Sequence, residues 1–372
     1  MDRSRDRCRR FWFLLMALLA LVAGPPGLRF ASAAEVTSKD DERLARWLKQ
    51  YPQADANRDG VLTMSEALEY RERLRRKPAE KPSAKEGRPD SPAPALADVR
   101  YGKHPRNLLD FYRAKSEGPT PVLIFFHGGG FVGGDKQGAA KQGLARRCLG
   151  SKISVVAANY RFVAGRDSEP FPGPMLDGAR VVQFVRTKAR EWNLDPKRVA
   201  LSGGSAGACM SMWIAMHDDL ADAASADPVA HESTRVSCVV AYGGQSCLDP
   251  KWIVENIGGD PGVHPSLMPF YGVRALPELD TPKAQALIRE ASPINYATKD
   301  DPPMYLVYGT PLAGTPLAPG TPIGTSIHHA RFGKLVQDKY AELKIPCELR
   351  YEGHVPAQDE LVFLKKHFGM GP

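Results

Sequence analysis

The stretch Leu201-Ser202-Gly203-Gly204-Ser205-Ala206-Gly207 contains the pattern Gly-x-Ser-x-Gly. The residues just before it are apolar and predict a short strand, and the apolar run 208–216 behind it predicts a buried helix. A sharp strand-to-helix turn of this kind holds a serine hydroxyl in the open, as a nucleophile elbow does. Glycines at 203 and 207 suit the turn, because a Cβ there would collide with the neighbouring chain. A simple Gly/Ser turn is the alternative, so a second motif must decide.

That second motif lies upstream. Residues 121–126 read PVLIFF, a continuous apolar run typical of a parallel strand that is buried on both faces. The run ends in His127-Gly128-Gly129-Gly130. A loop of glycines presents backbone N–H groups with no side chains in the way. Such donors stabilise the oxyanion of an acyl-transfer intermediate.

The two motifs together resemble those of the α/β-hydrolase superfamily, and more narrowly its hormone-sensitive-lipase-like and feruloyl–acetylxylan-esterase-like serine esterases. The segments Asn159-Tyr160-Arg161-Phe162 and Pro170-Phe171-Pro172 are similar to the same esterases. The resemblance implies an α/β fold with a mostly parallel, doubly wound sheet. It also implies a nucleophile and three oxyanion-binding N–H groups, which fall here on Ser205 and on Gly129, Gly130 and Ala206.

The pattern after Asp98 alternates strands and helices, as doubly wound sheets do. Helices are expected at 177–191, 205–216 and 359–368. Strands are expected at Leu108–Arg113, Val122–Phe126, Ser154–Arg161, Val199–Leu201, Val236–Tyr242, Met304–Tyr308 and Cys347–Glu352. Residues 243–303 form an insertion whose Trp252, Ile253, Phe270 and Tyr271 either cover the serine and shape an acyl pocket or belong to additional core helices.

A serine hydroxyl needs a base to take its proton, and histidine is suited to this near neutral pH. In this fold the chain order is serine, acid, histidine, so the base is expected after the last strand. Tyr351-Glu352-Gly353-His354 stands there, and His354 is therefore the predicted base. The pair His328-His329 leads into an expected helix, where capping or packing is the preferred interpretation.

The acid that should orient this histidine is missing from its usual place. No Asp or Glu occurs from Pro302 through Gln337, which includes the strand expected at 304–308 and the loop behind it. Asp249, after the strand expected at 236–242, is the preferred substitute, although Asp followed by Pro is also typical of a helix N-cap. Glu352, Asp338 and a serine–histidine dyad without an acid are the other possibilities.

The N-terminal residues 1–34 have the pattern of a secretory signal peptide. Five arginines precede the apolar run 11–23, and Ala31-Ser32-Ala33-Ala34 provides an A-x-A cleavage site. The apolar run is shorter than the ~20 residues of a membrane span, so a secreted or periplasmic protein without a stable span is expected, with a retained anchor as the alternative. Removing the segment leaves 44 basic and 40 acidic residues, a net charge of +4, which gives no support to nucleic-acid binding.

Residues 41–76 predict a single EF-hand. The sequence Asp55-Ala56-Asn57-Arg58-Asp59-Gly60-Val61-Leu62-Thr63-Met64-Ser65-Glu66 fits the calcium loop, with Gly60 at the turn. A polar turn between two helices is the alternative. The expected Ca²⁺ ligands are Asp55, Asn57, Asp59, the carbonyl of Val61, Thr63 and Glu66. Residues 77–97 are rich in proline and predict a linker, which places the hydrolase domain at 98–372.

The sequence therefore predicts an exported serine carboxylesterase that acts on a small or polysaccharide-linked ester, such as an acetyl or feruloyl ester. Its chemistry would need no cofactor, and the Ca²⁺ would be structural. The missing acid favours a rival interpretation, a non-catalytic relative that only binds ligands. A peptidase similar to prolyl oligopeptidase is a second rival, and the lack of a propeller-sized N-terminal domain argues against it.

Overall fold

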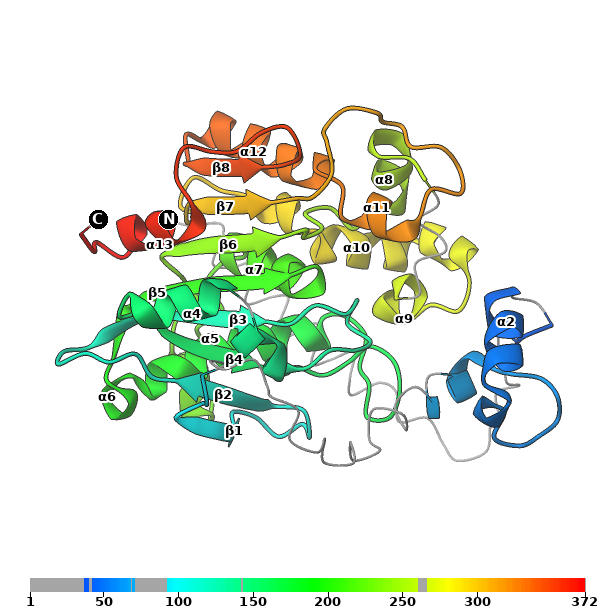
Figure 1. Ribbon diagram of the computed structural model, residues 1–372, viewed down its shortest axis with the longest axis horizontal. Helices are drawn as coiled ribbons and strands as arrows, with labels where there is room; N and C mark the ends of the chain where they lie inside the picture. The colour runs from blue at the N-terminus through cyan, green and yellow to red at the C-terminus, as the bar shows by residue number, and fades with distance from the viewer. Residues whose placement is uncertain are drawn as a thin grey trace, which may run out of the picture. The chain divides into compact units, whose positions relative to one another are not determined.

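The computed structural model describes residues 37–39, 42–67, 69–70, 92–141, 143–259 and 266–371 (Figure 1). The chain forms two compact units, Met1–Glu80 and Lys81–Pro372. The predicted signal peptide at 1–34 and most of the predicted linker at 77–97 lie outside the described residues. Within the described part, no helix has both the length and the apolar character that crossing a membrane requires.

The larger unit is built on one eight-stranded sheet with the order β1-β2-β4-β3-β5-β6-β7-β8. β2 pairs antiparallel with β1 and with β4, and every pairing from β4 through β8 is parallel. This confirms the predicted mostly parallel sheet. The strands are β1 Leu96–Arg100, β2 Leu108–Tyr112, β3 Thr120–Phe126, β4 Ser154–Ala158, β5 Leu194–Gly204, β6 Cys238–Tyr242, β7 Met304–Val307 and β8 Cys347–Arg350.

Seven strands lie where the sequence predicts them, and β1 is the exception. Its residues are mostly exposed, so it lacks the apolar pattern that marks the other strands. Asp98, the expected first residue of the domain, falls inside β1 and has a positive φ of 54°. The last two residues of the predicted linker, 96 and 97, therefore belong to β1, because strand pairing with β2 begins at Leu96.

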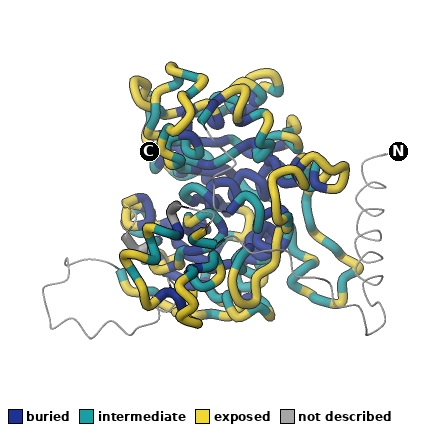
Figure 2. Tube along the Cα trace, turned by 90° about the vertical axis from the view of Figure 1, so that its right-hand side faces the viewer, coloured by how far each residue is buried: buried dark blue, intermediate teal, exposed yellow. Residues whose placement is uncertain are grey.

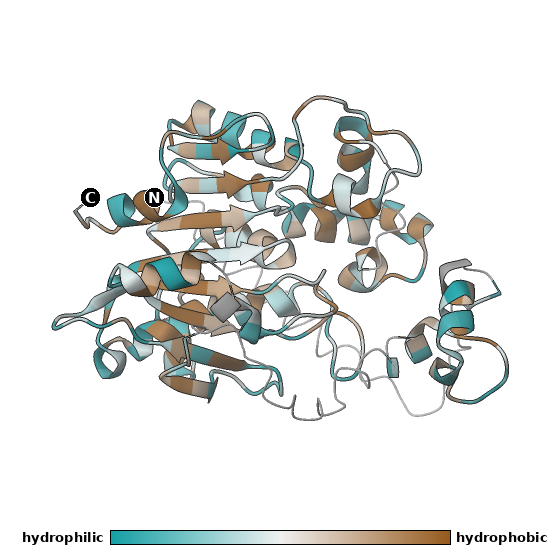
Figure 3. Cartoon of the chain, viewed as in Figure 1, coloured by the Kyte–Doolittle hydropathy of each residue, from teal (hydrophilic) through white to brown (hydrophobic). Residues whose placement is uncertain are grey.

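Helices cover both faces of the sheet and leave two buried cores. Alternate residues of β3 show this, since Ile124 packs in the core beneath α5 and α7 while Phe125 packs in the core beneath α4 and α13. Buried and apolar residues accordingly gather along the strands (Figures 2 and 3). The helices are α4 Gly143–Gly150, α5 Gly173–Thr187, α6 Ala189–Trp192, α7 Ala206–Met216, α8 Pro250–Asn256, α9 Leu267–Tyr271, α10 Pro282–Ala291, α11 Ile323–Ile327, α12 Arg331–Leu343 and α13 Glu360–His367.

The long connections after β6 and β7 gather at the carboxyl ends of the strands. They carry α8, α9, α10 and α11, which lie together to the right of the sheet in Figure 1. Ligands bind open α/β sheets at this edge. The insertion also packs on the elbow helix, where the indole N–H of Trp213 donates to the carbonyl of Glu290 at 2.9 Å.

The smaller unit consists of helix α2, Glu42–Gln50, a short 3-10 turn η1, Pro52–Ala54, and the loop that leads to helical residues 64–67. Leu44, Ala54, Leu62 and Tyr70 are buried in its own small core. Trp47 and Leu48 of α2 pack against this core as well.

Candidate active site

Ser205 sits at a strained turn between β5 and α7. Its φ and ψ are 51° and −116°, and its N–H donates to the carbonyl of Tyr242 on β6 at 2.8 Å. The turn is tight on both sides. A Cβ on Gly203 would lie 2.5 Å from the carbonyl carbon of Gly207, and a Cβ on Gly207 would lie 2.1 Å from the carbonyl oxygen of Phe126. The structure thus has the strand–turn–helix geometry that the Gly-x-Ser-x-Gly pattern predicts.

The glycine loop after β3 runs directly beside this turn. A Cβ on Gly128 would lie 2.9 Å from the carbonyl oxygen of Gly204. His127 is buried and stacks on Tyr160, with ring centroids 4.3 Å apart, and the Tyr160 hydroxyl donates to the His127 carbonyl at 2.7 Å. The histidine of this motif therefore anchors the loop to β4.

Two of the three expected oxyanion donors line one pocket with Ser205. They are Gly130, which has a φ of 60°, and Ala206, the first residue of α7. An N–H in the first turn of a helix has no acceptor within that helix, so the N–H of Ala206 is suited to a substrate oxygen. Gly129 has a φ of 117°, and its carbonyl accepts a hydrogen bond from the N–H of Val132 at 3.1 Å, which holds the loop in shape.

The imidazole that reaches Ser205 is that of His328. Its Nε2 lies 2.9 Å from the Ser205 Oγ. His328 directly follows α11, in the connection between β7 and β8. Burial lowers the pKa of His328 below its ordinary value, and a hydrogen bond with the backbone of Gly324 offsets this only in part. The ring is thus neutral at neutral pH and able to accept a proton from the serine.

The prediction that His354 faces the serine is wrong. His354 follows β8, but the chain turns at once, with its N–H donating to the Tyr351 carbonyl at 2.9 Å and its carbonyl accepting from the Tyr351 N–H at 3.0 Å. Its exposed ring stacks on Tyr351, with centroids 5.2 Å apart. This tight turn keeps His354 at the end of its own strand.

Asp249 is also not beside the histidine. It is the N-cap of α8, where its carboxylate accepts from the N–H of Lys251 at 2.9 Å, as the Asp-Pro pattern also allowed. Asp338 pairs with Lys334 along α12, and Glu352 is exposed. In the part of the chain that the structure describes, no carboxylate forms a hydrogen bond or ion pair with His328.

The two neighbouring histidines have different roles. His329 is buried, and its Nδ1 accepts from the N–H of Arg331 at 3.2 Å, so the packing role expected for the pair holds for this residue. The same expectation is wrong for His328. The signal that could have identified it is the combination of an acid-free connection and a histidine within it.

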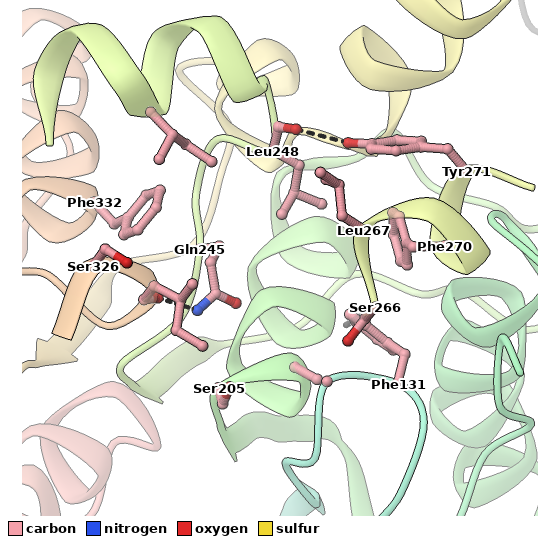
Figure 4. Close-up of a pocket in the computed structure, with 14 residues that line it drawn as sticks. Phe131, Ser205, Gln245, Leu248, Ser266, Leu267, Phe270, Tyr271, Ser326 and Phe332 are labelled. Carbon is pink, nitrogen blue, oxygen red and sulfur yellow. Dashed lines mark hydrogen bonds between the residues drawn. The ribbon is translucent and has the colours of Figure 1, made fainter. Parts of the chain in front are cut away.

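The pocket beside Ser205 is small and mostly apolar (Figure 4). Its cavity volume is ≈ 80 Å³. Three of the four aromatic or aliphatic residues expected from the insertion, Ile253, Phe270 and Tyr271, line it, while Trp252 packs on Phe332 with ring centroids 5.8 Å apart. The other lining residues are Gly130, Phe131, Ser205, Ala206, Gln245, Leu248, Ser266, Leu267, Ser326, Ile327 and Phe332.

The loop of the smaller unit directs its acidic side chains inward. Asp55 is buried, and its two carboxylate oxygens accept from the N–H groups of Arg58 at 2.7 Å and Gly60 at 2.9 Å. Burial acts to raise the pKa of Glu66, but hydrogen bonds with Thr63, Asn57 and Ala56 outweigh it, so that this pKa is lowered. The lowered pKa keeps Glu66 an ionised oxygen donor. Within the described ranges, however, no three His, Cys, Asp or Glu side chains form a metal-binding group.

Known proteins with similar sequences include a probable carboxylic ester hydrolase and an esterase. The BD-FAE family model matches residues 109–313. The probable carboxylic ester hydrolase LipM of Mycobacterium tuberculosis (strain ATCC 25618 / H37Rv) is 26% identical over 216 residues, 57% of this chain and 47% of the relative. Esterase LipQ of the same strain is 27% identical over 223 residues, 58% of this chain and 49% of the relative. The chain thus spans about half the length of the curated relatives it matches.

Two solved structures share the fold. A truncated form of a carbohydrate esterase from gut microbiota has a TM-score of 0.55 and 17% identity, covering 76% of this chain and 96% of the other. An acetyl ester-xyloside bifunctional hydrolase from Caldicellulosiruptor lactoaceticus has a TM-score of 0.51 and 22% identity, covering 70% and 81%. Together with the sheet order and the elbow, they show the α/β-hydrolase fold.

Proposed function

Because this chain belongs to the BD-FAE family, we propose that it is a carboxylic ester hydrolase that works through an acyl-enzyme. The observation that carries the proposal is the 2.9 Å contact between Ser205 Oγ and His328 Nε2 at a nucleophile elbow. The comparisons support it, since the curated relatives include a probable carboxylic ester hydrolase and an esterase.

The reaction follows from the geometry. Ser205 Oγ attacks the ester carbonyl while His328 Nε2 takes its proton, and the oxyanion is bound by the N–H groups of Gly130 and Ala206, with Gly129 shaping the loop. His328 then gives the proton to the departing alcohol. A water molecule, activated by the same imidazole, releases the acid and restores the serine hydroxyl.

A main-chain carbonyl takes the place of the triad acid in this proposal. Because Nε2 is at the serine, we assign the hydrogen bond with the backbone of Gly324 to the other ring nitrogen, Nδ1, as its donor. This assignment gives the tautomer that leaves Nε2 free to accept a proton. A neutral carbonyl stabilises the imidazolium less than a carboxylate does. In a serine protease, replacing the triad Asp with Asn costs about 10⁴ in kcat, partly because the tautomer is then wrong. Here the tautomer is right, so we expect a smaller deficit.

The pocket favours short acyl groups. Its ≈ 80 Å³ cavity and apolar lining suit acetyl better than feruloyl, which carries a substituted aromatic ring. We propose that the acetyl group is attached to a polysaccharide outside the cell. The signal-like residues 1–34 support export, and two of the structural neighbours are themselves a carbohydrate esterase and an acetyl ester-xyloside hydrolase.

The test is Ser205→Ala assayed with p-nitrophenyl acetate, with Ser202→Ala as the matched control on the same strand. Ser205→Ala should lose at least about 10³-fold in kcat/KM. Ser202→Ala should keep its rate, because the Ser202 hydroxyl is buried and does not line the pocket. Activity within tenfold of wild type in Ser205→Ala excludes the serine mechanism. An inactive wild type favours the ligand-binding alternative.

We also propose that the loop 55–66 binds one structural Ca²⁺ through Asp55, Asn57, Asp59, the Val61 carbonyl, Thr63 and Glu66. The support is the spacing of hard oxygen donors and their inward direction. Calorimetry on the full chain should show binding in the range of about 10⁻⁴–10⁻³ M, typical of extracellular modules, and Glu66→Gln should weaken it. Because the loop belongs to a different compact unit from Ser205 and His328, EDTA should leave ester turnover unchanged. No heat with millimolar Ca²⁺ would rule the site out.

A further inference from the structure

The segment that leaves β6, residues 242–245, contacts both members of the reacting pair. At one end, the carbonyl of Tyr242 accepts from the N–H of Ser205 at 2.8 Å. In the middle, Gly243 packs against the imidazole of His328, since a Cβ on Gly243 would lie 3.3 Å from its Cδ2. The segment is itself tied to the sheet, because the Gly243 N–H donates to the carbonyl of Val307 on β7 at 2.8 Å.

At the other end of this β6 exit segment, Gln245 holds the chain just before the histidine. Its Nε2 donates to the carbonyl of Ile327, the residue that precedes His328, and to the carbonyl of Gly243 at 3.2 Å. Both partners are acceptors, and this assigns the amide nitrogen rather than the oxygen to that side. Figure 4 shows the nitrogen of Gln245 directed along the dashed bond, with the amide oxygen on the other side.

This contact matters because it holds the residue next to His328. Further along the chain, the Ala330 N–H donates to the Thr310 hydroxyl at 2.9 Å and the Ser246 hydroxyl donates to the Phe332 carbonyl at 2.8 Å. Helix α11 has only five residues, Ile323–Ile327, and His328 follows it with φ and ψ of −117° and 24°. The bond to Gly324 lies within the same connection, so it orients the ring but does not tie the connection to the sheet. The Gln245–Ile327 bond ties the connection to the β6 exit segment at the residue that precedes His328.

We propose that Gln245 is a positioning residue, which sets the distance between Ser205 and His328 by fastening the α11 connection to the β6 exit segment. The proposal rests on the esterase function proposed above. Gln245 takes no part in the bond-making steps. Its amide holds Ile327, and the imidazole then stands where the serine proton can reach Nε2.

The first experiment compares Gln245→Leu with Gln285→Leu on p-nitrophenyl acetate. Leucine keeps most of the side-chain volume and removes the amide in both cases. Gln285 is a matched control, because it is also half-buried and its Nε2 donates to a main-chain carbonyl, that of Leu279, at 2.8 Å, but it does not line the pocket. Gln245→Leu should lower kcat by roughly 10–100-fold with KM changed less than about threefold, as expected when a catalytic group is misplaced. Gln285→Leu should leave both constants unchanged.

The second experiment asks whether Gln245 acts through His328. In a His328→Ala background, Gln245→Leu should lower kcat by less than about twofold, because there is no imidazole left to position. A merely structural role would give the same loss in both backgrounds.

Three results would overturn the proposal. They are an unchanged kcat in Gln245→Leu, a higher KM at unchanged kcat, which would make Gln245 a substrate contact, and equal losses with and without His328. Failure of the esterase function itself is seen separately, as an inactive wild type or an active Ser205→Ala.

Discussion

Two connections leave neighbouring strands of the sheet, and they carry their histidines to different places. The connection after β7 runs through α11 and brings His328 to 2.9 Å from the Ser205 hydroxyl. The connection after β8 closes a turn between Tyr351 and His354 and leaves the second histidine exposed. β6 and β7 lie between β5 and β8, and adjacent strands are ~4.8 Å apart, so a group at the end of β8 must span roughly 14 Å to reach the elbow.

The difference shows that the length and path of each connection decide which histidine lies beside Ser205. A long connection with its own helix can cross the carboxyl ends of several strands, whereas a four-residue turn cannot. The same crossing places main-chain carbonyls beside the imidazole, because α11 supplies Gly324. In the proposed mechanism, one connection thereby delivers both the base and the group that orients it, without a carboxylate from another strand.

The largest effect is expected from His328→Ala. Without the base, kcat/KM for p-nitrophenyl acetate should fall by at least about 10³-fold, while the melting temperature stays close to that of wild type. Steady-state kinetics on folded protein, checked by circular dichroism, measure this. Retention of more than a tenth of the wild-type rate would show that the connection after β7 does not supply the base.

An intermediate effect is expected from Gly243→Ala. The added Cβ would stand 3.3 Å from the His328 ring, and Gly243 has a φ of 58°, which costs any other residue some strain. Displacing the imidazole should lower kcat roughly 10–100-fold. Gly309→Ala in the connection after β7 is the control, because its Cβ would meet nothing within 4 Å. Equal rates in the two variants would mean that the ring is not held against Gly243.

The smallest effect is expected from Asp249→Asn. Asparagine caps a helix about as well as aspartate, so the rate and the melting temperature should both change little, with kcat within about twofold of wild type. The same steady-state assay and a thermal melt check this. A fall of more than tenfold in kcat at unchanged stability would restore Asp249 as the acid.

Much of the fold could be predicted from local pattern. Apolar runs mark β3 through β7, whereas β8 reads Cys-Glu-Leu-Arg and buries only Leu349. The glycines around Ser205 specify the elbow because only they fit the tight approaches to Phe126 and Gly204. β1 was not predicted, because an exposed edge strand needs no apolar pattern. In the site, Ser205, Gly130 and Ala206 come together as their motifs predict.

The choice of histidine could not be predicted in the same way. Chain order favours His354, and the sequence alone does not show that the chain turns back at Tyr351. Nor does a residue type reveal a backbone carbonyl, so an acceptor such as Gly324 leaves no signal in the sequence. The sequence shows that no Asp or Glu follows β7 before Asp338. Which group takes the place of the acid depends on the tertiary structure.

The most direct test of the account is imidazole rescue of two variants measured side by side, His328→Gly and His354→Gly. His328→Gly should lose ester hydrolysis and regain part of it as imidazole is added. His354→Gly should start within about twofold of the wild-type rate and gain nothing from imidazole, because the exposed His354 ring stacks on Tyr351 and it is His328 that contacts the serine. The opposite pattern, with His354→Gly inactive and rescued while His328→Gly works normally, would contradict the account.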